Sequence, residues 1–179
     1  KLAAISPTNG SLMWEGTVAV PRGATELERM ADITSLPVVG ARATCAVAYQ
    51  GRVACFDMSN GSTLWTRDLS SSKGLDLDDR HVFVTDEKGA VHALDISSGA
   101  SAWKQDQLAS RGTGRPLVSG DQVFVGDSEG YVHILKKDDG TLVGRQRVAS
   151  SPIVADLQRA AGDIIAQTRD GTVAAIGVQ

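Results

Sequence analysis

Short apolar stretches alternate with small polar turns along the whole chain, and the alternation repeats at a regular interval. Residues 51–65 (GRVACFDMSNGSTLW) and 89–103 (GAVHALDISSGASAW) share one layout: glycine, alternating apolar residues, aspartate, a turn with glycine, then tryptophan. Three other segments keep most or part of this layout: 2–14, 130–144 and 171–177. The opening glycines stand at positions 51, 89, 130 and 171, so their spacing is 38, 41 and 41 residues. Such self-similarity predicts a structural unit of about 40 residues that is copied along the chain.

Each repeat contains enough apolar segments for four short strands. The opening glycine lies between two runs of alternating apolar residues, which predicts a β-hairpin, and the second turn (TNG, SNG, SSG or DDG) predicts another tight reversal. A further apolar segment precedes each hairpin, at 36–40, 74–77, 115–120 and 151–156, and helical periodicity is suggested only over 24–32. Four antiparallel strands in about 40 residues are typical of a β-propeller blade.

The predicted fold is therefore all-β, a single partial β-propeller domain of four-stranded antiparallel blades over residues 1–179. We expect a half blade over 1–20, an inter-blade loop over 21–34, complete blades over 35–70, 71–109 and 110–148, and a partial blade over 149–179. The half blade and the partial blade both contain the third strand of a blade, so they cannot complete each other without one strand left over. This argues against a closed four-bladed ring and predicts about half of a larger ring, belonging to a longer protein.

The three tryptophans occupy the same place in the repeat. Trp14, Trp65 and Trp103 each follow the second turn, at the start of the outermost predicted strand. One blade alone cannot bury both of its faces, so a large side chain at a fixed position can seal it against its neighbour. We expect these tryptophans to be structural, and Gly144 breaks the series in the last complete blade.

The composition narrows the classes of function. The chain is 42% hydrophobic and 22% charged, with a formal net charge of -3, as in a soluble globular protein. The absence of a Lys/Arg block gives no support for nucleic-acid binding. There is no run of about 18 apolar residues, so the sequence encodes no membrane span.

The histidines and aspartates that could form a metal or catalytic site fall at equivalent positions of successive repeats, whereas a functional site is usually a departure from a repeat. His92 and His133 fall at equivalent positions of successive blades, where side chains diverge around a ring, so we expect them to be structural and predict no metal site. Asp57 and Asp95 end equivalent strands and are expected to cap turns. The acidic stretch 74–81 lacks the spacing of a Ca²⁺ loop and is interpreted as a solvated turn.

The two cysteines leave two alternatives open. If the hairpin over residues 44–56 reverses around Gln50, then Cys45 and Cys55 face each other across adjacent strands. Cross-strand Cβ distances of about 4.5–5.5 Å lie slightly beyond an unstrained disulfide, so a bond needs a small adjustment. The pair is either a disulfide or two buried thiols that serve as small apolar residues.

The repeat resembles a known family. The pattern A-x-D-x-x-x-G-x-x-x-W, seen in ALDISSGASAW, resembles the quinoprotein-type propeller repeat. More specifically, PRGATELERMADITSLPVV, VAYQG, LWTRDLSSS and VGDSEGYVH are similar to the C-terminal half of the BamB-type outer-membrane assembly lipoproteins. The resemblance implies an eight-bladed propeller, lipid-anchored to the outer membrane and facing the periplasm, although this piece itself is expected to be soluble. It implies a non-catalytic scaffold without cofactor, which docks the periplasmic repeat domains of the central barrel subunit and aids insertion of outer-membrane proteins.

The inter-blade loop is the expected partner-binding site. It is longer than the other connections, and loops held by a rigid scaffold often carry binding. The candidate contact residues are Arg22, Glu26, Leu27, Arg29, Met30 and Asp32. The resemblance implies acidic positions in this loop; Asp32 matches one, while the second, two residues on, is Thr34. Without the resemblance, an ordinary solvated insertion would be the preferred interpretation. Pairing of unfolded substrate strands with exposed blade edges is a second expected route.

The alternative function is a fragment of a quinone-dependent periplasmic oxidoreductase. The resemblance to that class implies a quinone and Ca²⁺ in the central funnel, beside adjacent cysteines. Cys45 and Cys55 are ten residues apart, and no cluster of carboxylates and amides stands out. The sequence therefore favours the scaffold.

Overall fold

Seventeen strands form the described part of the chain, which in this computed structural model comprises residues 1–19 and 32–177. The first sheet has two strands, β1 (Leu2–Ile5) and β2 (Leu12–Gly16). The second contains β3 (Val38–Val39), β4 (Ala43–Val47), β5 (Arg52–Asp57) and β6 (Thr63–Asp68). The third contains β7 (Leu75–Leu77), β8 (His81–Thr85), β9 (Val91–Asp95) and β10 (Ser101–Gln105). The fourth contains β11 (Leu117–Ser119), β12 (Gln122–Gly126), β13 (Tyr131–Lys136) and β14 (Leu142–Arg147), and the last contains β15 (Gln158–Ala160), β16 (Asp163–Gln167) and β17 (Val173–Gly177).

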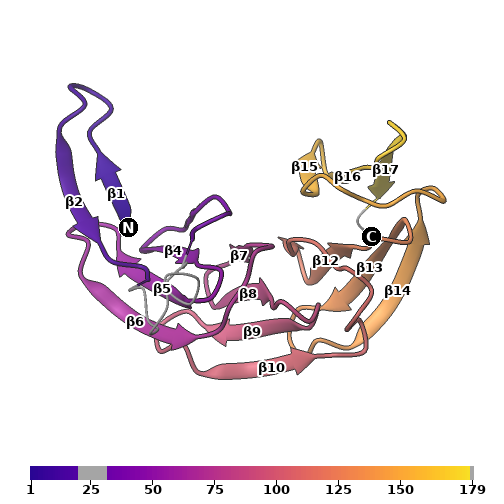
Figure 1. Cartoon of the computed structure of the whole chain (residues 1–179), viewed down its shortest axis with the longest axis horizontal. Helices are drawn as coiled ribbons and strands as arrows, with labels where there is room; N and C mark the ends of the chain where they lie inside the picture. The colour runs from indigo at the N-terminus through magenta and orange to yellow at the C-terminus, as the bar shows by residue number, and fades with distance from the viewer. Residues whose placement is uncertain (20–31, 178–179) are drawn as a thin grey trace, which may run out of the picture.

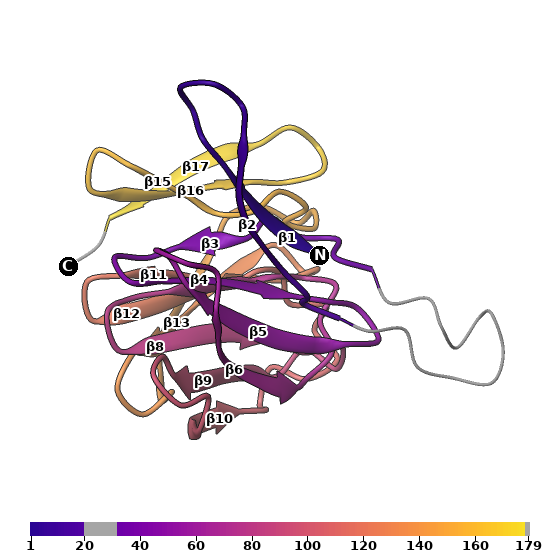
Figure 2. The same ribbon diagram turned by 90° about the vertical axis from the view of Figure 1, so that its left-hand side faces the viewer.

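The sheets follow one another around an open arc. Within each sheet, consecutive strands pair antiparallel, as expected for blades that are built from hairpins. Figure 1 shows β6, β10 and β14 along the convex side of the arc, whereas β7 contacts both β3 and β11 on the inner side. Figure 2 shows the same sheets stacked behind one another. The predicted fold class, a β-propeller of four-stranded antiparallel blades, is confirmed.

The hydrophobic core is divided into layers between neighbouring sheets. The central strands β4, β8 and β12 are buried on both faces, because each sheet is covered by one neighbour on either side. One layer joins Val47 and Val53 of the second sheet to Leu75 and Val84 of the third. Valine and alanine are the most frequent residues in these layers, which also hold Phe56, Phe83 and Phe124, and adjacent sheets pack closely. A blade therefore obtains its stability from the blades beside it.

The innermost strand of the last sheet lies later in the chain than the apolar pattern predicts. The predicted strand at 151–156 is wrong: Ile153 makes only an isolated bridge to Thr168, and Val154 is 55% exposed. The strand is β15, because a tight turn with Ala161 and Gly162 at φ 51° and 92° joins it directly to β16. The turn thus fixes the register, and the polar segment pairs while the more apolar one does not. The helical periodicity over 24–32 falls outside the described residues, except for Asp32, which forms an isolated bridge.

A disulfide joins the two central strands of the second sheet. Cys45 of β4 and Cys55 of β5 are register partners with their Cα atoms 4.2 Å apart, and both side chains are fully buried. The structure thus has the first of the two arrangements that the sequence left open. The bond lies in the core layer between the second and third sheets, and this layer also contains Trp65 of β6.

We expect Cys45→Ala together with Cys55→Ala to lower the free energy of unfolding by ~2–3 kcal/mol, because the bond closes a short loop in the unfolded chain. Urea denaturation followed by circular dichroism measures the loss. In the native wild type, alkylation by iodoacetamide should remain negligible even with a mild reductant, since neither sulfur atom is accessible. A double variant as stable as the wild type would contradict this contribution.

Candidate protein-interaction surface

The three tryptophans, one in each of the first three sheets, connect their sheet to a turn of the next sheet. The indole Nε1 atoms of Trp14, Trp65 and Trp103 donate to the carbonyls of Met58, Ile96 and Lys137, at 3.1, 2.7 and 2.8 Å. Three residues beyond each carbonyl, a glycine of positive φ lies under the ring, and an added Cβ there would approach the indole to within 2.5–2.6 Å. These glycines are Gly61, Gly99 and Gly140. The tryptophan and glycine positions of the repeat are therefore two halves of one contact between blades.

Asp32 is the one predicted contact residue that the structure describes. Its amide donates to the Tyr49 carbonyl at 3.3 Å, and the Tyr49 amide donates back at 2.7 Å, so the backbone is fixed to the β4–β5 turn. Its side chain is exposed. The other five predicted contact residues, Arg22, Glu26, Leu27, Arg29 and Met30, lie outside the described residues. Their role stays a prediction.

The segment that follows Asp32 presents every second side chain to solvent. Asp32, Thr34 and Leu36 are exposed, Leu36 to 71%, while Ile33 packs against the core layer of the first and second sheets. Thr34 Oγ1 donates to the Ser72 carbonyl at 3.2 Å, which ties the segment to the connection that leads into the third sheet. Asp32 and Thr34, the two positions that the family resemblance singled out, therefore share one exposed side of a restrained segment.

A buried polar cluster in the fourth sheet has no counterpart among the predicted site residues. The carboxylate of Asp127, which is fully buried, lies 2.8 Å from His133 Nε2 and accepts from Arg111 Nε at 2.8 Å. It also accepts from the amides of Glu129 and Tyr131, both at 2.9 Å. Burial alone would raise the pKa of Asp127, but these hydrogen bonds hold that pKa below its ordinary value.

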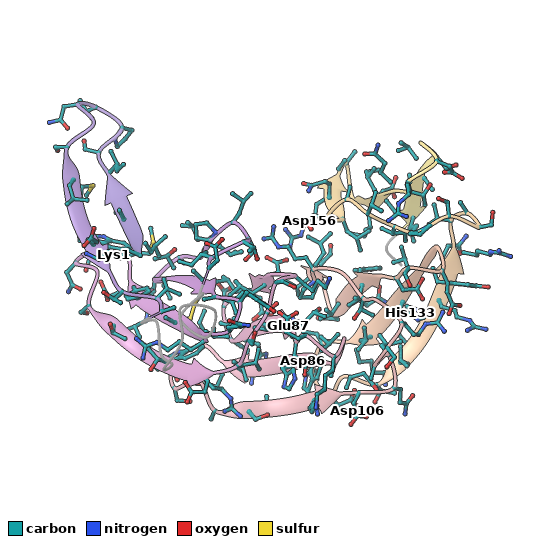
Figure 3. The ribbon with its side chains drawn as sticks, viewed as in Figure 1. Lys1, Asp86, Glu87, Asp106, His133 and Asp156 are labelled. Carbon is teal, nitrogen blue, oxygen red and sulfur yellow. A yellow bond between two sulfur atoms is a disulfide. The ribbon has the colours of Figure 1, made fainter. Side chains whose placement is uncertain are left out.

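The third sheet repeats half of this cluster. Asp86 Oδ2 lies 2.8 Å from His92 Nε2, and no arginine of the described residues joins this pair. Figure 3 labels Asp86 of this pair and His133 of the fourth sheet. Each aspartate precedes its hairpin glycine by three residues and each histidine follows it by three. The spacing D-x-x-G-x-x-H is the sequence signal from which these pairs could have been predicted. Each histidine contacts the aspartate of its own hairpin, so both histidines have a structural role.

A buried aspartate near the inner side of the arc corrects another expectation. Asp76 of β7 lies in the acidic stretch that we interpreted as a solvated turn, but its side chain is buried. It accepts from the Val118 amide of β11 at 2.9 Å and pairs with Arg159 of β15. The partner that offsets its burial comes from a strand two sheets further on, which no local pattern could indicate.

The turn aspartates act locally. The Asp95 carboxylate accepts from the hydroxyls and amides of Ser97 and Ser98, and these bonds lower its pKa to about 2. Asp57 caps the equivalent turn through Ser59, which lowers its pKa as well. Both residues therefore stabilise a reversal of the chain.

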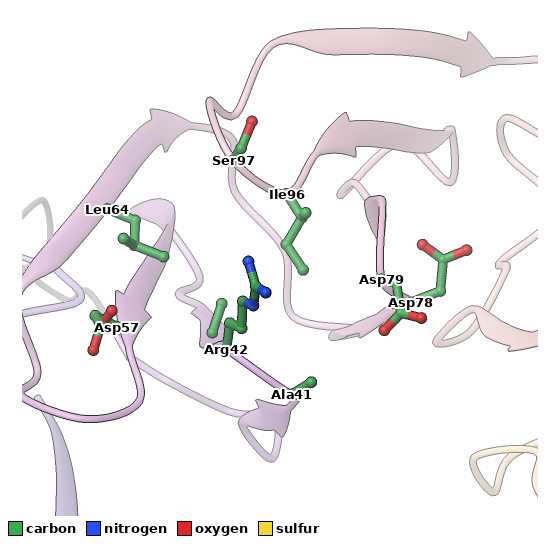
Figure 4. A pocket seen from close by; sticks show the side chains of 9 residues that line it. Ala41, Arg42, Asp57, Leu64, Asp78, Asp79, Ile96 and Ser97 are labelled. Carbon is green, nitrogen blue, oxygen red and sulfur yellow. The ribbon is translucent and has the colours of Figure 1, made fainter.

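A groove lies between the second and third sheets, with a volume of about 580 Å³. Figure 4 shows Leu64 and Ile96 on its walls, with Arg42 and Asp78 beside them. Asp78 already accepts from the amides of Arg80 and His81, at 2.8 and 2.7 Å, and pairs with Lys137. The groove thus offers apolar walls, but its acidic groups mainly serve neighbouring turns.

Across residues 1–19 and 32–177, histidine, cysteine, aspartate and glutamate side chains form no group of three or more that could hold a metal ion. Within these same stretches, no helix has the length and apolar character needed to cross a bilayer.

The four-stranded antiparallel blades and their repeat define the class of protein: a β-propeller built from quinoprotein-type repeats, with loops and strand edges exposed at its surface. Within this class, the chain belongs to the BamB family of outer membrane protein assembly factors, because the family's model matches residues 1–105 and 102–179. The assembly factor BamB of Nitrosomonas eutropha is 44% identical over the whole chain and 44% of its own length. BamB of Bordetella pertussis is 42% identical, over 97% of the chain and 45% of its own length. The chain thus spans about half the length of these curated relatives.

Solved structures agree with this assignment. The crystal structure of BamB from Moraxella catarrhalis superposes with a TM-score of 0.86 at 30% identity, over 96% of this chain and 51% of that one. A quinohemoprotein alcohol dehydrogenase from Comamonas testosteroni gives a TM-score of 0.67 at 17% identity, covering 90% of this chain and 31% of its own. The second likeness concerns the fold alone.

Proposed function

We propose that the chain is part of a non-catalytic scaffold for outer-membrane protein assembly, which docks the periplasmic repeat domains of the central barrel subunit. The proposal depends on the segment from Asp32 to Leu36. This segment exposes alternate side chains, and it is held by backbone hydrogen bonds to Tyr49 and by the Thr34 hydroxyl, which donates to Ser72. A restrained, exposed segment loses little conformational entropy when it binds. Family membership supports the assembly role.

We further propose that the full-length protein lies at the periplasmic face of the outer membrane and is held there by a lipid anchor. The disulfide between Cys45 and Cys55 supports an oxidising compartment such as the periplasm. Blade edges offer a second route of contact, because an extended substrate strand can pair with an exposed outer strand.

We expect Asp32→Arg to weaken binding to the partner's periplasmic repeat domains by about tenfold, since reversing a rim charge disturbs electrostatic complementarity more than packing. The measurement is surface plasmon resonance with the full-length parent protein and the isolated repeat domains. The thermal unfolding midpoint should stay unchanged, because the Asp32 side chain is exposed and its bridge to Tyr49 uses backbone atoms only.

Asp79→Arg is the matched control. Asp79 is an exposed aspartate in the β7–β8 turn of another sheet, so its reversal changes the net charge by the same amount. It should leave the affinity within about twofold of the wild type. If Asp32→Arg binds as tightly as Asp79→Arg, Asp32 is not part of the docking surface.

A further inference from the structure

The outermost strand of the fourth sheet departs from the repeat at several positions at once. Gly144 of β14 replaces the tryptophan of the other blades, and Arg147, three residues later, stands where β6 ends on Asp68. The third sheet has Asp106 at that position, directly after β10. Tyr131 follows its hairpin glycine where the third sheet has Ala90. Positions that serve only the blade are copied between blades, so a cluster of departures indicates another role.

Three arginines, of which Arg147 is one of these departures, surround the ring of Tyr131. The guanidinium carbons of Arg111, Arg145 and Arg147 lie 5.9, 5.1 and 5.7 Å from the centre of the Tyr131 ring. Register pairs Tyr131 with Arg147 and His133 with Arg145, so these four side chains share one face of the sheet. Interactions with the ring contribute to holding the cations in place, although like charges repel one another.

Two of the three arginines remain without a carboxylate partner among the described residues. Arg111 is neutralised, because it pairs with Asp127 at 2.7 Å and with Glu129 at 2.9 Å. Arg145 and Arg147 are exposed and make no such pair within the described ranges; Arg147 Nε donates only to the Ala149 carbonyl, at 3.2 Å. The patch therefore presents uncompensated positive charge on a chain whose formal net charge is -3.

The shape of the patch favours an extended ligand. Arg145 lines a groove of about 430 Å³ together with Leu108 and Val143, the latter 46% exposed. Among the strands of the described residues, β14 pairs only with β13, so its other edge carries no strand. Arg145 and Arg147 are two residues apart on one strand, so their Cα atoms are about 6.5–7 Å apart, which matches alternate residues of another strand.

We propose that β14 and the Arg145–Arg147 patch bind an extended acidic segment of a partner protein, whose carboxylates at alternate positions pair with the two arginines. The segment adds to the open edge of β14, and an adjacent apolar side chain contacts Val143 and Leu108 in the groove. Main-chain hydrogen bonds give affinity in this mode, and the alternate side chains give specificity. This surface does not depend on the docking proposed for Asp32, since it lies on another sheet.

The test uses the chain alone and a fluorescein-labelled peptide in which glutamates alternate with threonines and which ends in valine. Fluorescence anisotropy should show binding that weakens with added salt. Arg145→Gln with Arg147→Gln should weaken it about tenfold, whereas Arg145→Lys with Arg147→Lys should retain most of it. The control, Arg42→Gln with Arg80→Gln, removes the same charge from two exposed arginines in the β3–β4 and β7–β8 turns and should stay within twofold of the wild type.

Four results would overturn the proposal. The first is no binding of the alternating peptide by the wild type, and the second is equal loss in the Arg145/Arg147 and Arg42/Arg80 glutamine variants, which would indicate general charge attraction. The third is equal affinity for a peptide with lysines in place of the glutamates. The fourth is binding of phosphatidylglycerol vesicles without binding of the peptide, which would make the patch a lipid surface. Because the peptide assay contains no barrel subunit, its result is independent of the Asp32 measurement.

Discussion

Trp103→Ala should lower the free energy of unfolding by ~3–5 kcal/mol, the loss expected for truncating a large buried aromatic side chain. The Trp103 side chain is 8% exposed and lies over the turn glycine of the next sheet, Gly140. Its Nε1 donates to the Lys137 carbonyl at 2.8 Å, and its ring centre lies 5.9 Å from that of Phe83. Removing the indole would open a cavity between two blades and leave that carbonyl without its donor. Guanidinium denaturation followed by circular dichroism measures the effect.

Trp103→Phe separates the two contributions. It keeps an aromatic ring over Gly140 but lacks the N–H group, so we expect a smaller loss, with about 1 kcal/mol of it from the missing hydrogen bond. Val143→Ala, at an exposed position of β14, serves as the control and should cost less than about 0.5 kcal/mol. A loss below about 1 kcal/mol for Trp103→Ala would show that the indole does not seal the blades.

The repeat predicted the fold because its spacing and its alternation agree. Glycines at 51, 89, 130 and 171 each lie in the turn of a hairpin, and around the first three the apolar segments form buried central strands. Apolar character alone failed where turn geometry decides which residues pair. The innermost strand of the last sheet forms at Gln158–Ala160 because the turn into β16 sets its register, not because its residues are apolar.

The buried polar residues were harder to predict from the sequence, because their partners lie far away along the chain. Asp76 is buried because Arg159, 83 residues away, reaches it across two sheets, and an acidic stretch alone suggests solvent. The role of the tryptophans as seals was predictable from their recurrence, whereas their glycine partners were attributed to turn geometry alone. Asp32 came from the family resemblance, and the structure adds only that its backbone is held and its side chain exposed.

Asp127→Ala should be as costly as the loss of Trp103, at ~3–5 kcal/mol, because it removes one partner of a buried ionic network. Asp127 is fully buried and receives hydrogen bonds from Arg111, His133 and two backbone amides. Without the carboxylate, the His133 ring and the Arg111 guanidinium lose their common acceptor. Denaturation at neutral pH measures the loss, and Asp127→Asn, which keeps one oxygen acceptor, should lose less.

Asp86→Ala is the matched control, since Asp86 occupies the same repeat position and pairs with His92. The Asp86 side chain is 18% exposed and, within residues 1–19 and 32–177, has no arginine partner, so we expect a loss of only ~1–2 kcal/mol. The pKa of Asp127 is lowered in the folded state, so its carboxylate stabilises the fold above its unfolded pKa, near 3.9. This contribution is lost as the pH falls through the folded pKa. The difference in stability between the wild type and Asp127→Ala should therefore shrink as the pH falls below about 4. A constant difference down to pH values well below that would mean that packing, and not the ionised carboxylate, holds this cluster together.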